Sequence, residues 1–266
     1  MKRVFRASLY LAIAAALAAS ACGTSDDSSG TGGGGIGDGG SGGSGGGLVC
    51  EGAPVPCEDT MIQEMQLVDT VAPGQVGINE AVDGTWVSHV DATAGGFGAN
   101  PPHAFVYARF TDAGLEKVEI TDEEALESAD WDIAFRRYLI RINSGDSGPS
   151  CVTAARMAPG TSFETAAGPT DEAAWRRDDF YTETCEFMND GSGLPGSPAT
   201  ALASFYTYTG CVKMTGNVYV IRTADGRMAK FTVDAYYGEN QETCQTDDTP
   251  PAGGSGNVIV RWAFLE

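Results

Sequence analysis

The sequence predicts an all-β protein, a mostly antiparallel sheet with one or two short helices. Aromatic and β-branched segments of strand length recur through the second half of the chain, Gly- and Asp-containing turns separate them, and helical patterns are short. About 215 residues follow Leu48, which is enough for one domain with a core of its own. We therefore expect a single β domain over residues 49–266.

The first hairpin is predicted within residues 103–120. His103–Phe110 is rich in aromatic and β-branched residues, and Leu115–Ile120 alternates apolar with polar residues. Between them, Asp112-Ala113-Gly114 supplies turn residues, so the two segments should pair in an antiparallel hairpin.

A helix and a long strand are expected next. Thr121 and Glu124 occupy the two positions of a capping box, in which a hydroxyl and a carboxylate accept hydrogen bonds from free amides at a helix start. This helix should run to about Ala129. Asp132–Ile142 then has the composition of one long strand, with apolar residues at both parities.

Residues 156–200 are rich in loop-forming residues, and a helical pattern occurs only over Thr170–Phe180, where Thr170 would cap the first turn. Ala224-Asp225-Gly226 predicts a tight hairpin turn, because glycine accepts the positive φ that such turns need. The predicted strands of this half are Phe205–Tyr208, Asn217–Thr223, Met228–Tyr237 and Asn257–Phe264.

Residues 1–21 have the three parts of a secretory signal peptide. Basic residues stand among the first six, and Leu9–Ala19 supplies an apolar core far shorter than the roughly 20 residues of a membrane span. Small residues then lead into Cys22, which resembles the acylated cysteine of a bacterial lipobox, although Ala19 stands where Leu is usual. The alternative is an ordinary signal peptide cut near Ala21, leaving Cys22 unmodified.

Residues 22–48 should form the lipidated cysteine and a flexible tether. Their Gly/Ser composition cannot bury apolar surface, and such a chain has a root-mean-square reach of about 25–30 Å. Gly23 after the cysteine resembles lipoproteins sorted to the outer membrane. We therefore expect an outer-membrane lipoprotein, periplasmic or surface-exposed, whose membrane partner is reached through acyl chains such as palmitate on Cys22.

The charge excludes one class of partner. The formal net charge is −20, and removal of the three leader cations takes it to −23. A surface this acidic repels nucleic-acid phosphates and does not favour lying flat on anionic lipid. Solubility is the simplest role of the charge, and no nucleic-acid partner is expected.

Six cysteines remain beside Cys22, and in an oxidising compartment they predict three disulfides. Cys50 and Cys57 flank a Pro-containing loop and could pair locally, which would leave three connectivities for the others. A metal site is the alternative, but no Cys-x-x-Cys or Cys/His ligand spacing occurs, so no metal is expected. The six are Cys50, Cys57, Cys151, Cys185, Cys211 and Cys244.

Catalytic motifs are not found in the sequence. The chain holds two histidines, His89 and His103, with no nucleophile elbow, no metalloprotease helix motif and no phosphate-binding loop. Adjacent acid pairs point apart on a helix or strand and so make no acid/base couple. We expect a protein that is not an enzyme.

Two stretches resemble the HmuY family. Trp131–Tyr138, followed by Asn143–Gly148, is similar to the family's Trp-Asp, Arg-Tyr and Asn-x-Gly-x-Ser-Gly signature, and Val220–Lys230 is similar to its strand–turn–strand segment. The resemblance covers about residues 80–266. Members are haem-binding surface lipoproteins, so it implies haem as cofactor and an outer-membrane receptor as partner. We expect Trp131 and Asp132 themselves to build core and turn rather than bind a ligand.

The resemblance also suggests where haem would be held. Members of the family coordinate the haem iron with two side chains downstream of the Asn-x-Gly-x-Ser-Gly turn, which are His in some members and Met in others. In this chain no histidine follows His103. Tyr208 lies nearest the second position, and Met188 is the soft ligand in the loop that would hold the first. His89 and His103 stay open as ligands if the loop 95–102 folds over a pocket.

The implied function is binding of haem or a related porphyrin for uptake. The alternative is a surface interaction module that keeps the HmuY-like scaffold and has lost haem ligation.

Overall fold

The computed structural model of the chain describes residues 52–194 and 196–266. The predicted signal peptide, Cys22, the tether and Cys50 lie outside the described residues. Everything described belongs to the unit Gly45–Glu266.

The mostly antiparallel β fold with short helices is confirmed, and every ladder between the described strands is antiparallel. The strands are β1 (Val76–Val82), β2 (Thr85–Asp91), β3 (Val106–Thr111), β4 (Gly114–Val118), β5 (Ile133–Arg136), β6 (Leu139–Ile142), β7 (Thr153–Arg156), β8 (Tyr206–Tyr208), β9 (Val212–Met214), β10 (Val218–Arg222), β11 (Met228–Ala235) and β12 (Asn257–Phe264). The helices are α1 (Glu58–Glu64), α2 (Asp122–Ala125), α3 (Gln241–Asp247) and the 3-10 turns η1 (Glu172–Ala174) and η2 (Gly238–Asn240).

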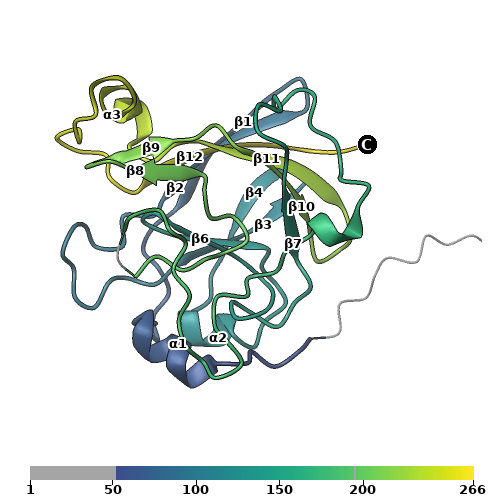
Figure 1. The fold of residues 1–266 in the computed structure, drawn as a ribbon, viewed down its shortest axis with the longest axis vertical. Coiled ribbons are helices and arrows are strands. Elements are labelled where there is room, and N and C mark those ends of the chain that lie inside the picture. The colour runs from purple at the N-terminus through teal and green to yellow at the C-terminus, as the bar shows by residue number, and fades with distance from the viewer. Residues whose placement is uncertain (1–51, 195) are drawn as a thin grey trace, which may run out of the picture. The chain divides into compact units, whose positions relative to one another are not determined.

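Three sheets are built from these strands (Figure 1). The first has the order β1-β2-β12-β11-β10-β7, the second β4-β3-β5-β6, and β8 pairs with β9 alone. The main hydrophobic core draws side chains from the first two sheets, for example Trp262 and Phe110, whose rings meet edge to face at 4.9 Å. Burial of these large rings is what joins the two sheets.

A second core covers the other face of the β4-β3-β5-β6 sheet. Met61 of α1 and Ala125 of α2 pack there with Tyr107, Trp131 and Phe180, all of them fully buried. Figure 1 shows α1 and α2 together on this side, and α3 beside the β8–β9 ribbon at the other end. β5 and β6 are therefore buried on both faces, which explains why apolar residues occupy both parities of residues 132–142.

The first two sheets also meet at an edge, through the side chain of Asn79 on β1. Its amide donates to the carbonyl of Leu115 at 3.0 Å and accepts from the Leu115 N–H at 3.3 Å, as a neighbouring strand would. A Cβ on Gly114 would lie 2.7 Å from Cγ of Asn79, so only glycine fits at this point of the predicted turn.

The prediction of one long strand over Asp132–Ile142 is wrong, because the chain turns back within it. β5 and β6 are a hairpin in which Ile133 faces Ile142. The turn holds Arg137 at a positive φ of 53°, with its N–H donating to the carbonyl of Ala92 at 2.6 Å. A non-glycine residue in this conformation needs such outside support.

Other local predictions have mixed outcomes. The β3–β4 and β10–β11 hairpins are confirmed. The capping box of Thr121 and Glu124 is present with both of its hydrogen bonds, but α2 ends at Ala125 rather than near residue 129. The helix over Thr170–Phe180 is wrong: one 3-10 turn forms there, and its cap is the Asp171 carboxylate.

Disulfides join distant parts of the chain. Cys57 before α1 bonds Cys185, 128 residues away, and Cys211 bonds Cys244 in α3. Cys151 is disulfide-bonded as well. The local pairing of Cys50 with Cys57 is therefore wrong, because the partner of Cys57 is set by the packing of α1 against the 180s loop.

Candidate functional site

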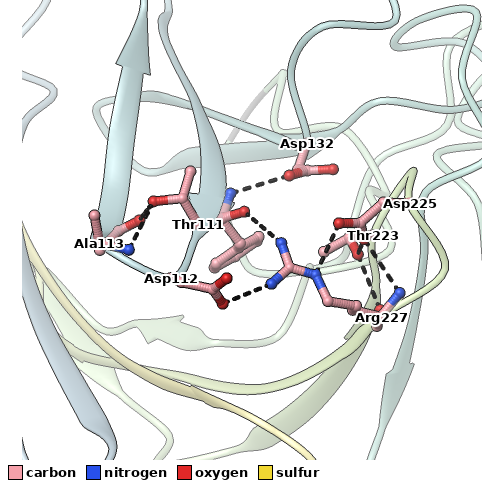
Figure 2. Close-up of polar contacts among 9 residues, drawn as sticks. Thr111, Asp112, Ala113, Asp132, Thr223, Asp225 and Arg227 are labelled. Carbon is pink, nitrogen blue, oxygen red and sulfur yellow. Dashed lines mark hydrogen bonds and ion pairs between the residues drawn. The ribbon is translucent and has the colours of Figure 1, made fainter.

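The two signature stretches meet in a polar junction (Figure 2). One Asp132 oxygen accepts from the N–H of Phe110 at 3.0 Å, and the other accepts from the N–H of Ala224 at 3.1 Å. Asp132 thereby extends the hydrogen bonding between β3 and β5 by one residue and connects the β10–β11 turn to these strands. Burial raises the pKa of this carboxyl group.

Arg227 completes the junction, as Figure 2 shows. Its guanidinium contacts Asp225 at 2.7 Å and Asp112 at 2.8 Å, and it lies 3.9 Å from the ring centroid of Phe264. One cation therefore contacts the β3–β4 turn, the β10–β11 turn and β12.

The rest of the signature is also structural. Trp131 is fully buried, and its indole N–H donates to the carbonyl of Ala125 at 3.0 Å. The Asn143 amide donates to the carbonyl of Trp131 at 2.8 Å. A Cβ on Gly148 would lie 2.3 Å from the Asn143 side-chain oxygen, so the glycine permits this close approach. Trp131, Asn143 and Gly148 thus build core and turns and do not line the cavity described below.

The last residue of β5, Arg136, and the first residue after it, Arg137, point to different parts of the protein. Arg136 is buried, donates to the carbonyl of Met65 at 2.6 Å and stacks 4.2 Å from the centroid of Phe105. It thus binds the C-terminal end of α1, where a cation is favoured. Arg137 instead reaches the wall of a cavity.

We call this space the tyrosine cavity; its volume is about 410 Å³. That size lies within the range of small-molecule sites, roughly 300–1,000 Å³. Its walls come from the loop before β3, the β5–β6 turn, the 190s loop, the β8–β9 hairpin, the end of β11 and the loop before β12. The lining residues are Phe97, Arg137, Tyr138, Leu194, Tyr208, Gly210, Val212, Tyr236, Tyr237, Pro250, Pro251 and Ser255.

The four tyrosines of the cavity differ in how their hydroxyl groups are used. The hydroxyl of Tyr236 shares a 2.9 Å hydrogen bond with Ser255, and that of Tyr237 accepts from the N–H of Val212 at 3.2 Å. Burial raises the pKa of Tyr236. Tyr208 is 39% exposed, and its hydroxyl has no hydrogen-bond partner within residues 52–194 and 196–266. The hydroxyl of Tyr138 likewise has no hydrogen-bond partner in that part of the chain, but Tyr138 is half-buried, so Tyr208 is the more exposed of the two tyrosines with an open hydroxyl.

Arg137 is the charged group of the cavity wall. Its Nη2 lies 3.4 Å from Oγ of Ser255, and its guanidinium lies 5.7 Å from the ring centroid of Phe97. Its Nη1 is buried and has no hydrogen-bond partner in the part of the chain that the structure describes. Phe97 itself is 96% exposed, at the rim of the cavity.

The structure brings only one of the two predicted haem ligands to this cavity. Tyr208 lines it, whereas Met188, 37% exposed, is not among the lining residues. His103 lines a separate crevice of about 140 Å³, and His89 lines a groove along β2 and β12. The loop 95–102 does reach the tyrosine cavity, but through Phe97 rather than through a histidine.

Sequence reasoning missed the other wall residues. Arg137 lies inside the signature, where only a structural role was expected, and Tyr236 lies at the end of a predicted strand. What marks these residues as a site is that a cation and several aromatic rings surround one cavity. This arrangement is visible only in the folded protein, because the residues are far apart in the sequence. Within the described residues, no group of three or more His, Cys, Asp or Glu side chains is placed to hold a metal ion.

Comparison with known proteins places the chain in a family. The model of the HmuY protein family matches residues 103–247, more than half of the chain. The chain belongs to the HmuY family. The matched stretch includes the signature junction and most of the tyrosine cavity of this HmuY-family protein. No curated protein sequence matches the chain.

Solved structures show weaker likeness. A candidate lipoprotein of Bacteroides fragilis is 16% identical, over 71% of this chain and 96% of its own, with a TM-score of 0.45. A candidate HmuY-like haem-binding protein of Bacteroides vulgatus is 16% identical, over 71% of this chain and 97% of its own, with a TM-score of 0.44. The apo HmuY analogue of Tannerella forsythia is 14% identical, over 75% of this chain and 98% of its own, with a TM-score of 0.34. The family assignment rests on residues 103–247.

The helices of the HmuY-family domain are short. None of those in the described residues combines the length and the apolar character needed to cross a membrane.

Proposed function

We propose that this HmuY-family protein binds haem or a related porphyrin in the tyrosine cavity, with Tyr208 as the candidate iron ligand. The observation that carries the proposal is the open Tyr208 hydroxyl in a cavity lined by aromatic rings. Aromatic walls suit a flat macrocycle, and tyrosinate is an established haem ligand. The resemblance to HmuY proteins supports the same ligand class.

Met188 could act as a second iron ligand only if the neighbouring loop, residues 190–198, moved. That loop is held by Tyr206, whose hydroxyl lies 3.0 Å from both Ser192 and Ser197. We therefore expect Tyr208 to matter more than Met188 for binding.

Haemin titration tests the proposal. Adding haemin to the protein should shift the Soret band, and Tyr208→Phe should change the position or the midpoint of that shift. Tyr181→Phe is the matched control, because Tyr181 lies in the second core, with its hydroxyl 3.1 Å from Glu64. No Soret shift in the unaltered protein would favour the interaction module that has lost haem ligation.

We further propose that the domain 49–266 is an outer-membrane lipoprotein, periplasmic or surface-exposed, which passes its ligand to an outer-membrane receptor. The leader and the small residues before Cys22 support the anchor, and the tether 22–48 supports a domain that stands off the membrane. Cells fed labelled palmitate should label the protein, and Cys22→Ser should abolish the label. A protein that stays unlabelled and soluble would instead point to ordinary signal cleavage near Ala21.

A further inference from the structure

We propose that Arg137 selects ligands of the tyrosine cavity by their carboxylate, so that the site takes planar aromatic acids and discriminates against their neutral esters. The inference rests on the proposed function, because it concerns the same cavity. It goes beyond iron ligation, because it assigns a group that recognises a different part of the ligand.

The hydrogen bonding of Arg137 is incomplete in a way that an anion would complete. Nη1 is buried without a partner in the described part of the chain, and the contact from Nη2 to Oγ of Ser255 is long, at 3.4 Å. A buried donor without a partner is unfavourable, and more so when it is charged. The planar fork of a guanidinium matches a carboxylate with two parallel hydrogen bonds.

The local charge favours an anion as well. The protein as a whole carries −20, with 36 acidic residues, yet none of the described residues lining the cavity is acidic. Arg137 is the one charged side chain of that lining. Lys213 and Asp248, on the neighbouring β9 and the end of α3, pair with each other at 2.6 Å. The lining thus presents one positive charge, without an acidic lining residue to offset it, to the carboxylate of a ligand.

The backbone that carries Arg137 is also held in place before any ligand arrives. The N–H of Arg137 donates to the carbonyl of Ala92 at 2.6 Å, and the residue sits in the tight turn between two strands that are buried on both faces. A rigid backbone at this position leaves less of the protein to be ordered when a ligand binds, which favours affinity. The exposed ring of Phe97, 5.7 Å from the guanidinium, adds an aromatic surface beside the charge. Both features together call for a ligand that is flat, aromatic and acidic.

The test compares haemin with haemin dimethyl ester, which have the same macrocycle and iron and differ in their carboxylates. Both are titrated against the unaltered protein in the same buffer with the same low detergent concentration. We expect the ester to bind about 10- to 100-fold more weakly, the size of a lost hydrogen bond to a charged group. Equal affinity for acid and ester would overturn the inference while leaving haem binding intact.

Variants then locate the effect at Arg137. Arg137→Gln should weaken haemin by a similar factor and leave the ester unchanged, while Arg137→Lys, which keeps the charge, should recover part of the loss. Arg177→Gln is the control, because Arg177 is 53% exposed and pairs with Asp179 away from the cavity lining. Equal weakening of acid and ester in Arg137→Gln would show a structural role only and so overturn the inference. If neither haemin nor the ester binds the unaltered protein, the proposed function fails with it.

Discussion

Replacing Asp132 with alanine tests whether the family signature works as a structural junction. The two oxygens of this carboxylate accept from the backbone N–H of Phe110, in one sheet, and from that of Ala224, in a turn between two strands of the other. The substitution removes both acceptors at once. It leaves the surrounding apolar packing nearly unchanged, since the carboxylate is the only part lost.

The expected loss of unfolding free energy follows from those two bonds. A buried donor that loses its partner costs about 1–3 kcal/mol. Phe110 is buried, so the loss of the partner of its N–H should cost close to the upper end of this range. Ala224 is half-buried beside an open crevice, where water can replace the lost acceptor, so its N–H should cost less. Burial raises the pKa of Asp132, so the wild-type carboxylate itself carries a desolvation cost that alanine removes. We therefore expect a net loss of about 2–3 kcal/mol.

Denaturant unfolding followed by circular dichroism measures this loss, and thermal unfolding should show a drop of roughly 4–12 °C for a domain of this size. Asp130→Ala is the control, because Asp130 is exposed and lines the same crevice. It should change stability by less than about 0.5 kcal/mol. If Asp132→Ala costs no more than Asp130→Ala, the junction does not hold the two sheets together and the reasoning fails.

Three further predictions concern stability. Burial raises the pKa of Asp178 to about 6, so its stabilising contribution is complete below pH about 4 and is lost as the pH rises through 6. The unfolding free energy of the protein relative to Asp178→Asn should therefore fall by about 2 kcal/mol from pH 4 to pH 7; a constant difference would contradict this. Replacing the Cys57–Cys185 pair with serines should cost about 2–5 kcal/mol in denaturant unfolding, because the bond closes a long loop, and an unchanged midpoint would count against it. Thr121→Ala should cost about 1 kcal/mol through loss of the α2 cap, and Thr121→Ser, which keeps a hydroxyl, should restore most of it.

Local patterns predicted part of the fold well. β12 has the predicted bounds Asn257–Phe264, and the turn at Ala224–Gly226 joins β10 to β11 with Gly226 at a φ of 83°. The Asp83-Gly84 pair carries the same kind of signal and marks the turn between β1 and β2, a hairpin that was missed. These features depend only on neighbouring residues, which is why sequence can reveal them.

Features set by distant contacts could not be predicted. The turn between β5 and β6 has no glycine or proline and depends on a bond from Arg137 to Ala92, 45 residues earlier. The Cys57–Cys185 pairing spans 128 residues in the same way. Each is fixed by packing that a local pattern does not encode.

The candidate site shows the same division. Tyr208 follows from the family resemblance and lines the cavity, but Phe97, Arg137 and Ser255 come from loops that only the folded sheets bring together. Met188 lies in the expected loop and not on the cavity wall. A motif can thus point to a ligand position, while the shape and charge of the cavity depend on tertiary structure.

The most direct test of haem binding is a haemin titration of the unaltered protein followed at the Soret band. We expect a change that saturates at one haemin per protein, with its spectrum or midpoint altered in Tyr208→Phe. A change that grows linearly without saturating, or a saturating change identical in Tyr208→Phe and the unaltered protein, would contradict the assignment of the tyrosine cavity as the haem site.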